Sequence, residues 1–131
     1  MLIAEVSAKY ELSPDTLRYY ERVGLVPHVH RNKSGIRDYT EDDCRWVEFI
    51  KCMRAAGLPI EVLIDYVSMF QQGDITIQAR KELLIEQRRK LIEKQAAMKA
   101  TIERLDYKIK SYDHLTKKES QLRTTPLFQE P

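Results

Sequence analysis

The stretch SPDTLRYYERVGLVP, residues 13–27, decides the fold of this chain. Ser13 can cap a helix with its side-chain oxygen, and Pro14 fits the first helical position because its ring presets the backbone angle. Gly24 is suited to end that helix, and Pro27 follows soon after, where it prevents the helix from continuing. The stretch therefore predicts one short helix that begins after Ser13 and ends at Gly24.

This predicted helix has an apolar face and a polar face. Leu17, Tyr20 and Val23 recur at helical spacing and can face a core. Arginine pairs with phosphate or with a guanine edge, and tyrosine and threonine hydroxyls also bond phosphate, so the polar face suits a DNA duplex. The outward residues are Asp15, Thr16, Arg18, Tyr19 and Arg22. These residues alone support two interpretations equally: a helix that contacts DNA and an ordinary solvated helix.

Charge is unevenly distributed over the 131 residues, which carry a formal net charge of +2. From Arg18 to Arg37 the basic residues far outnumber the acidic ones, of which Glu21 is the only example. This segment therefore predicts a local basic surface on an otherwise balanced protein. Glycine and proline are few, which favours a helical fold, and the length suits one small domain with an extension.

A hairpin is predicted after this helix. Residues 28–31 and 36–39 read as two short strands, because residues 32–35 between them have turn chemistry. Such a hairpin would form a wing beside the helix. His28 and His30 alternate onto one strand face, but no third ligand stands nearby in the sequence. We therefore expect neither a metal nor another cofactor.

The surrounding segments complete one domain over residues 1–73. Residues 2–10 predict a short helix, and residues 11–13 a tight turn, so a helix-turn-helix results. A third helix is expected to begin after Thr40 and a fourth at Pro59. The residues expected to face the core are Trp46, Phe49, Ile50 and Met53 of the third helix and Leu63, Tyr66, Val67 and Phe70 of the fourth.

A heptad repeat runs through the rest of the chain, which has no proline or glycine between residues 75 and 116. It predicts a long helix over residues 74–117 that packs on another long helix, and the partner is expected to be a second copy, which makes a homodimer. Residues 118–131 are expected to form a mobile tail. The positions expected in the dimer seam are Leu84, Leu91, Met98, Ile102, Leu105 and Ile109.

LRYYERVGL at residues 17–25 and GIRDYTEDD at residues 35–43 strongly resemble the MerR family of bacterial transcription regulators. The resemblance extends from the start of the chain to about Gly73. It implies a mainly α fold, with a winged helix-turn-helix followed by a long dimerisation helix in an antiparallel coiled coil. It also implies a dimer that binds an inverted repeat in double-stranded promoter DNA and distorts the promoter spacer, so that RNA polymerase can engage. The residues that it places on DNA are Thr16, Arg18, Tyr19 and Tyr20 of the helix and Arg37 and Tyr39 of the wing.

The resemblance also suggests what the regulator senses. Metal-sensing members carry a cysteine pair at the end of the long helix and drug-sensing members a large C-terminal domain, and we expect neither here. Cys52, in FIKCMRAAGLP, resembles the single cysteine of the thiol- and aldehyde-responsive subgroup, the NmlR and AdhR type. A free cysteine is often only a small buried residue, so a structural Cys52 stays open. The other cysteine, Cys44, is expected on the polar side of its helix.

The leading hypothesis is a regulator of the response to electrophiles, aldehydes or oxidants through Cys52. An architectural or non-covalent-ligand-responsive DNA-binding protein of the same fold is the alternative, with Cys52 structural. A thiol enzyme is disfavoured because no base lies near Cys52 in the sequence, so we expect no catalytic residue. The opening MLIAEVSAKY does not resemble a secretion signal, and no apolar run is long enough for a membrane, so we expect a cytoplasmic protein.

Overall fold

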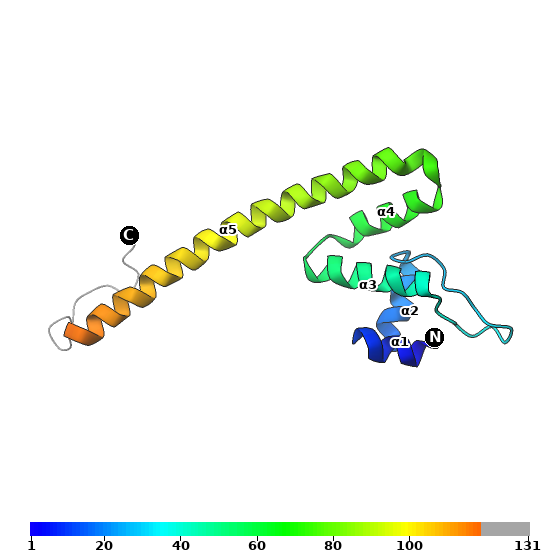
Figure 1. The fold of residues 1–131 in the computed structure, drawn as a ribbon, viewed down its shortest axis with the longest axis horizontal. Helices are drawn as coiled ribbons and strands as arrows, with labels where there is room; N and C mark the ends of the chain where they lie inside the picture. Colours follow the sequence, from blue (N-terminus) through cyan, green and yellow to red (C-terminus); the bar gives the residue numbers. More distant parts are fainter. Residues whose placement is uncertain (119–131) are drawn as a thin grey trace. The chain divides into compact units, whose positions relative to one another are not determined.

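The computed structural model describes residues 1–118, and every regular element within them is a helix (Figure 1). The elements are α1 (Ile3–Tyr10), α2 (Pro14–Val23), α3 (Glu41–Ala55), α4 (Ile60–Gln71), the short 3-10 helix η1 (Asp74–Thr76) and α5 (Ile77–Lys118). The predicted fold class is confirmed: a mainly α chain has a helix-turn-helix at its start and one long helix at the end of its described part.

The chain forms two compact units, and the division falls within α5. The first unit, Met1–Gln87, holds the first four α-helices, the wing and the opening turns of α5, and the second unit continues along α5. The predicted domains, residues 1–73 and 74–117, divide the chain before η1 instead, and they stay a prediction. The predicted tail, residues 118–131, lies almost wholly outside the described residues.

The helix-turn-helix forms through the local signals that the sequence carries. Glu11 ends α1 in a left-handed conformation, with a φ of 55°. The Ser13 hydroxyl then accepts a hydrogen bond of 3.0 Å from the backbone N–H of Thr16 and caps α2. Gly24, with a φ of 85°, ends α2 as predicted, because a left-handed C-cap is easiest for glycine. These signals fix the limits of α2 and so set which of its side chains face outward.

A small apolar core supports α2. Leu17 is only 1% exposed and is the main contribution of α2 to this core. Ile3, Tyr10 and Leu12 pack against the cluster from the region of α1 and the turn. The buried members of the cluster are Val6, Leu17, Val29, Tyr39, Cys44 and Val47.

The buried face of α3 differs from the predicted one. Cys44 was expected on the polar side, but it is buried, together with Val47 and Ile50. Of the four residues expected inside, Ile50 is buried, whereas Trp46, Phe49 and Met53 are only half-buried. The wing accounts for the burial of Cys44, because it contributes Val29 and Tyr39 to the cluster that holds this residue.

The wing contains no strand among the described residues, so the predicted strands at residues 28–31 and 36–39 are wrong. A single antiparallel bridge joins Arg31 and Arg37. The reason is that other groups take the backbone hydrogen bonds a strand would use. The N–H groups of Val29 and His30 donate to side-chain carboxylates, and the N–H of Tyr39 donates to the carbonyl oxygen of Met1.

The predicted long helix is present as α5, whose 42 residues run without a break. At 1.5 Å per residue this is a rise of roughly 60 Å. Many of its large apolar side chains are exposed, which is unusual for a stable single helix. None of the described helices is both long enough and apolar enough to cross a membrane.

Candidate nucleic-acid interface

The outward face of α2 carries the side chains that were predicted to contact DNA. Arg18 is exposed, and one guanidinium nitrogen lies 3.0 Å from the carboxylate of Asp15. The Thr16 hydroxyl accepts a hydrogen bond of 2.9 Å from Ser13, and the half-buried Tyr19 ring lies 5.4 Å from the guanidinium carbon of Arg22. Because Asp15 neutralises Arg18 only through an exposed pair, Arg18 can exchange that partner for phosphate or a base edge.

Tyr20 and Tyr39, the other two aromatic residues predicted to contact DNA, are largely buried. Tyr20 is 7% exposed and Tyr39 is 2% exposed. The hydroxyl of Tyr39 is buried and has no hydrogen-bond partner among the described residues. Burial raises the pKa of Tyr39, so its hydroxyl stays protonated and remains a donor. Tyr39 belongs to the core cluster and Tyr20 is one of the buried residues of α2, so neither ring lies open on the surface.

One buried carboxylate joins α2 to the wing. Glu21 lies on α2 and is 7% exposed. Its Oε1 accepts a hydrogen bond of 2.7 Å from Nε of Arg37 and lies 3.9 Å from a guanidinium nitrogen of Arg31. Its Oε2 accepts a hydrogen bond of 2.9 Å from the backbone N–H of Val29 and lies 3.6 Å from Nδ1 of His28. Glu21 therefore contacts both arms of the wing.

The ionised form of Glu21 is the favoured one. Burial alone raises the pKa of this carboxyl, but the hydrogen bonds from Arg37 and from the Val29 N–H, with the charges of Arg37 and Arg31, outweigh it. The net result is a lowered pKa, so Glu21 is a carboxylate at neutral pH. Its charge offsets part of the basic surface and holds the arginines in place.

A second carboxylate anchors the first arm of the wing to α3. Asp43 is 7% exposed, and its Oδ2 accepts hydrogen bonds of 3.2 Å from the His30 N–H and 3.0 Å from the Thr40 N–H. Nδ1 of His30 lies 2.9 Å from the same oxygen. Burial raises the pKa of Asp43, and the hydrogen bonds from Thr40 and His30 outweigh this effect and lower it. His28 therefore lies next to Glu21, and His30 lies next to Asp43. No group of three metal-ligating side chains occurs within residues 1–118.

Neither anchoring carboxylate was identified from the sequence as a functional residue. Glu21 is the only acidic residue between Arg18 and Arg37, and an isolated acid among basic residues is a sequence signal for an ion pair. Asp43 forms a capping box with Thr40, the residue after which α3 was predicted to begin. Its additional bonds to His30 depend on how the wing folds back, which local sequence does not encode.

Cys52 is exposed, near the C-terminal end of α3. The two cationic neighbours in sequence are engaged elsewhere. Nζ of Lys51 donates to the backbone carbonyl of Tyr10, and a guanidinium nitrogen of Arg54 donates to the carbonyl of Leu58 at 2.8 Å. The thiol is therefore accessible to a reagent, while both flanking cations are bonded to main-chain oxygens.

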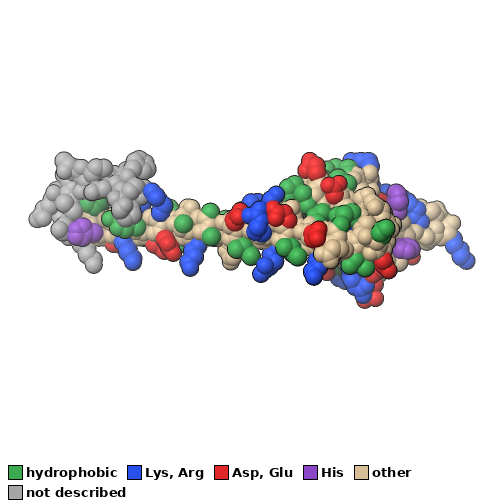
Figure 2. Space-filling view, turned by 90° about the horizontal axis from the view of Figure 1, so that it is seen from above, with side chains coloured by type: hydrophobic (Ala, Val, Ile, Leu, Met, Phe, Trp, Pro, Cys, Tyr) green, Lys and Arg blue, Asp and Glu red, His purple; other side chains and the backbone are tan. Residues whose placement is uncertain are grey.

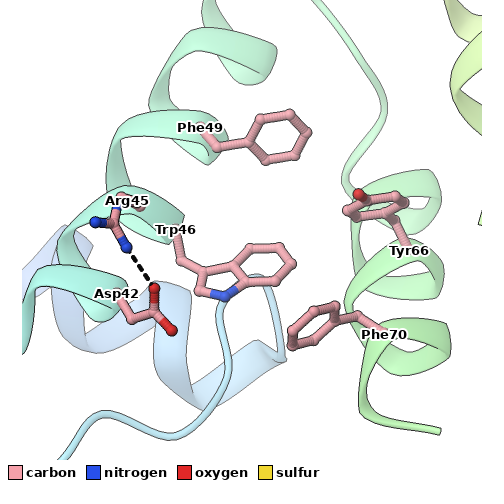
Figure 3. Close-up of a pocket in the computed structure, with 6 residues that line it drawn as sticks. All are labelled: Asp42, Arg45, Trp46, Phe49, Tyr66 and Phe70. Carbon is pink, nitrogen blue, oxygen red and sulfur yellow. Dashed lines mark hydrogen bonds and ion pairs between the residues drawn. The ribbon is translucent and has the colours of Figure 1, made fainter. Parts of the chain in front are cut away.

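An aromatic pocket lies between α3 and α4, and we define it by the six residues labelled in Figure 3. Trp46 and Phe49 project from α3, and Tyr66 and Phe70 project from α4 toward them (Figure 3). The ring centroids of Trp46 and Phe70 are 4.9 Å apart. Asp42 and Arg45, at the edge, pair at 2.7 Å. The pocket has a volume of about 400 Å³.

The predicted seam residues lie along α5. Leu84 and Leu91 are half-buried, whereas the later ones are exposed. Figure 2 shows hydrophobic side chains recurring along the helix between charged ones. The exposed fractions are 65% for Met98, 52% for Ile102, 55% for Leu105 and 59% for Ile109.

Comparisons with protein families agree with this geometry. The family described as "MerR HTH family regulatory protein" matches residues 1–70, which cover α1 to α3, the wing and all but the last residue of α4. The family described as "MerR, DNA binding" matches residues 44–107. Together the two matches include the helix-turn-helix, the wing and most of α5.

Individual relatives are similar as well. The HTH-type transcriptional regulator AdhR of Bacillus subtilis is 58% identical over 93 residues, which are 71% of this chain and 66% of AdhR, just under two thirds of that protein. A MerR-family regulator from Listeria monocytogenes has a crystal structure that matches with a TM-score of 0.89 and 47% identity over 94% of both chains. HiNmlR, described as a MerR family regulator lacking the sensor domain and bound to promoter DNA, matches with a TM-score of 0.78 and 29% identity over 88% of this chain and 91% of that one.

Proposed function

Since this chain belongs to the MerR family of DNA-binding transcriptional regulators, we propose that it acts as a homodimer on an inverted-repeat promoter. In this proposal it distorts the promoter spacer so that RNA polymerase engages, and it responds to electrophiles, aldehydes or oxidants through Cys52. The cytoplasm is the proposed location. The observation that carries the dimer is the row of exposed apolar side chains along α5.

The dimer proposal follows because the exposed apolar side chains of α5 would be stabilised by burial. Large exposed apolar residues at heptad spacing are stabilised when a second helix covers them. A second copy of α5 has the required length and the same spacing, and we propose an antiparallel pairing of the two helices. A two-fold dimer then presents two copies of α2 to DNA, which suits an inverted repeat.

The DNA contacts are proposed for α2 and the wing. Thr16, Arg18 and Tyr19 contact the duplex from the exposed face of α2, and Arg37 holds the phosphate backbone from the wing. Tyr20 and Tyr39 lie beneath this surface. The unpartnered Tyr39 hydroxyl supports a role in DNA binding, because a phosphate oxygen would satisfy this donor once the overlying side chains move aside.

The experiment that tests the proposal is a footprint on the DNA upstream of the chain's own gene, with and without an aldehyde, combined with transcription in vitro. We expect protection of two half-sites related by a two-fold axis, in both conditions. Transcription should rise only when the aldehyde is present. A response to aldehyde that releases the protein from DNA would contradict the proposed mode of action.

A second candidate is a regulator that binds a ligand non-covalently. The aromatic pocket between α3 and α4 favours it, because a volume of about 400 Å³ lies within the range of small-molecule sites. In that case Cys52 would be a structural residue, and transcription would respond to a ligand even after Cys52→Ser.

Arg18→Ala is expected to weaken promoter binding by about 1–3 kcal/mol, the usual scale for a specific arginine contact. The fold should persist, because Arg18 is exposed and its ion pair within residues 1–118 is with the exposed Asp15. Fluorescence anisotropy with a labelled promoter duplex measures the loss. Lys9→Ala, which removes an exposed cation from α1, serves as the control and should bind like the parent. Parent-like affinity of a folded Arg18→Ala protein would contradict the role assigned to α2.

Arg37→Ala is expected to weaken binding to promoter and scrambled duplexes by similar factors, because a phosphate contact carries no sequence information. The slope of log affinity against log salt should fall by about one unit. A salt titration with both duplexes measures this. Arg45→Ala removes an exposed arginine of α3 and should leave the slope unchanged. A loss confined to the promoter duplex would instead mean that Arg37 reads bases.

A further inference from the structure

A buried acidic residue, Glu21, lies next to the basic residues of the wing. An acidic side chain in a DNA-binding surface repels phosphate, so by charge alone it should weaken binding. Yet Glu21 is buried on the helix that presents Arg18, and its two oxygens contact four groups of the wing. Two of these groups are the guanidinium ions of Arg31 and Arg37. The arrangement is that of a residue that holds other residues in place.

The contacts of Glu21 come from both arms of the wing. Val29 and His28 belong to the first arm, Arg37 belongs to the second, and the bridge between Arg31 and Arg37 joins the two. Asn32 closes the turn between the arms, because its side-chain oxygen accepts hydrogen bonds from the N–H groups of Ser34 and Ile36. One carboxylate therefore fixes the base of a hairpin that lacks a strand ladder of its own.

Arg37 can contact DNA while its Nε remains hydrogen-bonded to Glu21. Its Nε donates to Glu21, and its side chain is 24% exposed. A guanidinium group has five N–H donors, so the bond through Nε leaves the terminal nitrogens for an anion. An arginine side chain that is ordered before binding loses less conformational entropy when it meets phosphate.

We propose that Glu21 is a positioning residue for DNA binding: it fixes both arms of the wing to α2, so that Arg31 and Arg37 meet the phosphate backbone already ordered. Glu21 does not touch DNA, and its contribution to affinity is positive despite its charge. Asp43 plays the supporting part on the α3 side, where it holds His30. This inference rests on the proposed contact between the wing and DNA.

The sign of the effect separates this proposal from simple electrostatics. Glu21→Gln removes a negative charge, so charge alone predicts tighter binding, whereas loss of positioning predicts weaker binding. Glu21→Asp keeps the charge but shortens the side chain by one methylene, so charge alone predicts no change. If two arginine side chains must be ordered on binding, affinity should fall about tenfold or more in both variants.

The experiment measures anisotropy of a labelled duplex from the region upstream of the chain's own gene, at several salt concentrations. Asp15→Asn is the matched control, because it removes an exposed carboxylate from the same helix and should tighten binding slightly. Hydrogen exchange without DNA gives an independent readout: the amide of Val29 should exchange faster in Glu21→Asp. Circular dichroism establishes that each variant is folded.

A further variant keeps the test decisive if the Glu21 variants do not fold. Arg37→Lys leaves Glu21 intact and keeps the positive charge, but lysine lacks the Nε donor and the planar fork. Positioning predicts a loss of about tenfold here too. Parent-like or tighter binding by Glu21→Gln or by Arg37→Lys overturns the inference. If Arg37→Ala also binds like the parent, the proposed wing contact fails as well, so the two failures are distinguishable.

Discussion

A chain that carries both Leu91→Asp and Met98→Asp is expected to sediment as a monomer and to lose promoter binding. Both positions belong to the heptad row of α5. Met98 is 65% exposed and Leu91 is half-buried in the single chain, so an aspartate at either position stays largely solvated there. In a dimer the same carboxylates would be buried in an apolar seam without partners.

The expected size of this effect is large because each copy brings two such charges. Burial of an unpaired carboxylate is strongly unfavourable, and we expect association to weaken by about a hundredfold or more. Promoter affinity should fall with it, because a monomer meets only one half-site at a time. Analytical ultracentrifugation and anisotropy on the same samples measure both quantities.

The control places the same charges outside the predicted seam. Ala96 and Ala100 are exposed residues of α5 that lie away from the heptad row. A chain with Ala96→Asp and Ala100→Asp should remain a dimer and bind the promoter. Dimeric behaviour of the Leu91 and Met98 variant would place the seam on another face of α5.

Cys52→Ser is expected to abolish activation by an aldehyde or oxidant while promoter binding stays as in the parent. Cys52 is exposed, so a reagent can reach it without unfolding α3. It lies near the C-terminal end of α3, close to the loop that leads into α4, and an adduct adds volume and polarity at this junction. A bias of about 1–3 kcal/mol between two arrangements is enough to shift their populations tenfold to a hundredfold.

Transcription in vitro with and without the aldehyde measures this effect, and mass spectrometry of the same samples shows whether an adduct forms on Cys52. The matched control is Cys44→Ala. Cys44 is buried in the core cluster, and alanine avoids the unpartnered hydroxyl that serine would introduce there. This control should respond like the parent once it is shown to be folded. Full activation of Cys52→Ser by the aldehyde would leave the aromatic pocket as the better candidate for sensing.

The helix boundaries were predictable because their signals are local. The caps at Ser13 with Pro14, at Thr40 and at Gly24 each act within a few residues, and each helix end is found where it was expected. The heptad row likewise predicted an unbroken α5. Elements whose limits depend on nearest neighbours in sequence can be read from the sequence alone.

The wing and the buried face of α3 were less predictable because they depend on contacts between distant residues. The alternation of residues 28–31 suggested a strand, but Glu21 and Asp43 take the backbone N–H groups of Val29 and His30. The side of α3 that carries Cys44 looked polar, yet the wing covers it. Tyr39 is buried through this packing as well, whereas the burial of Tyr20 agrees with its helical spacing on α2.

The bonds of Glu21 have a consequence for engineering and for evolution. A wing taken from a relative and grafted onto this chain would bring its own arginines. The residue of the relative's second helix that orders those arginines would not be transferred with the wing. Residues 21, 31 and 37 should therefore be exchanged together when promoter preference is redesigned. Among natural relatives, a change at position 21 should be accompanied by a change at position 37, although sixteen positions separate them in the chain.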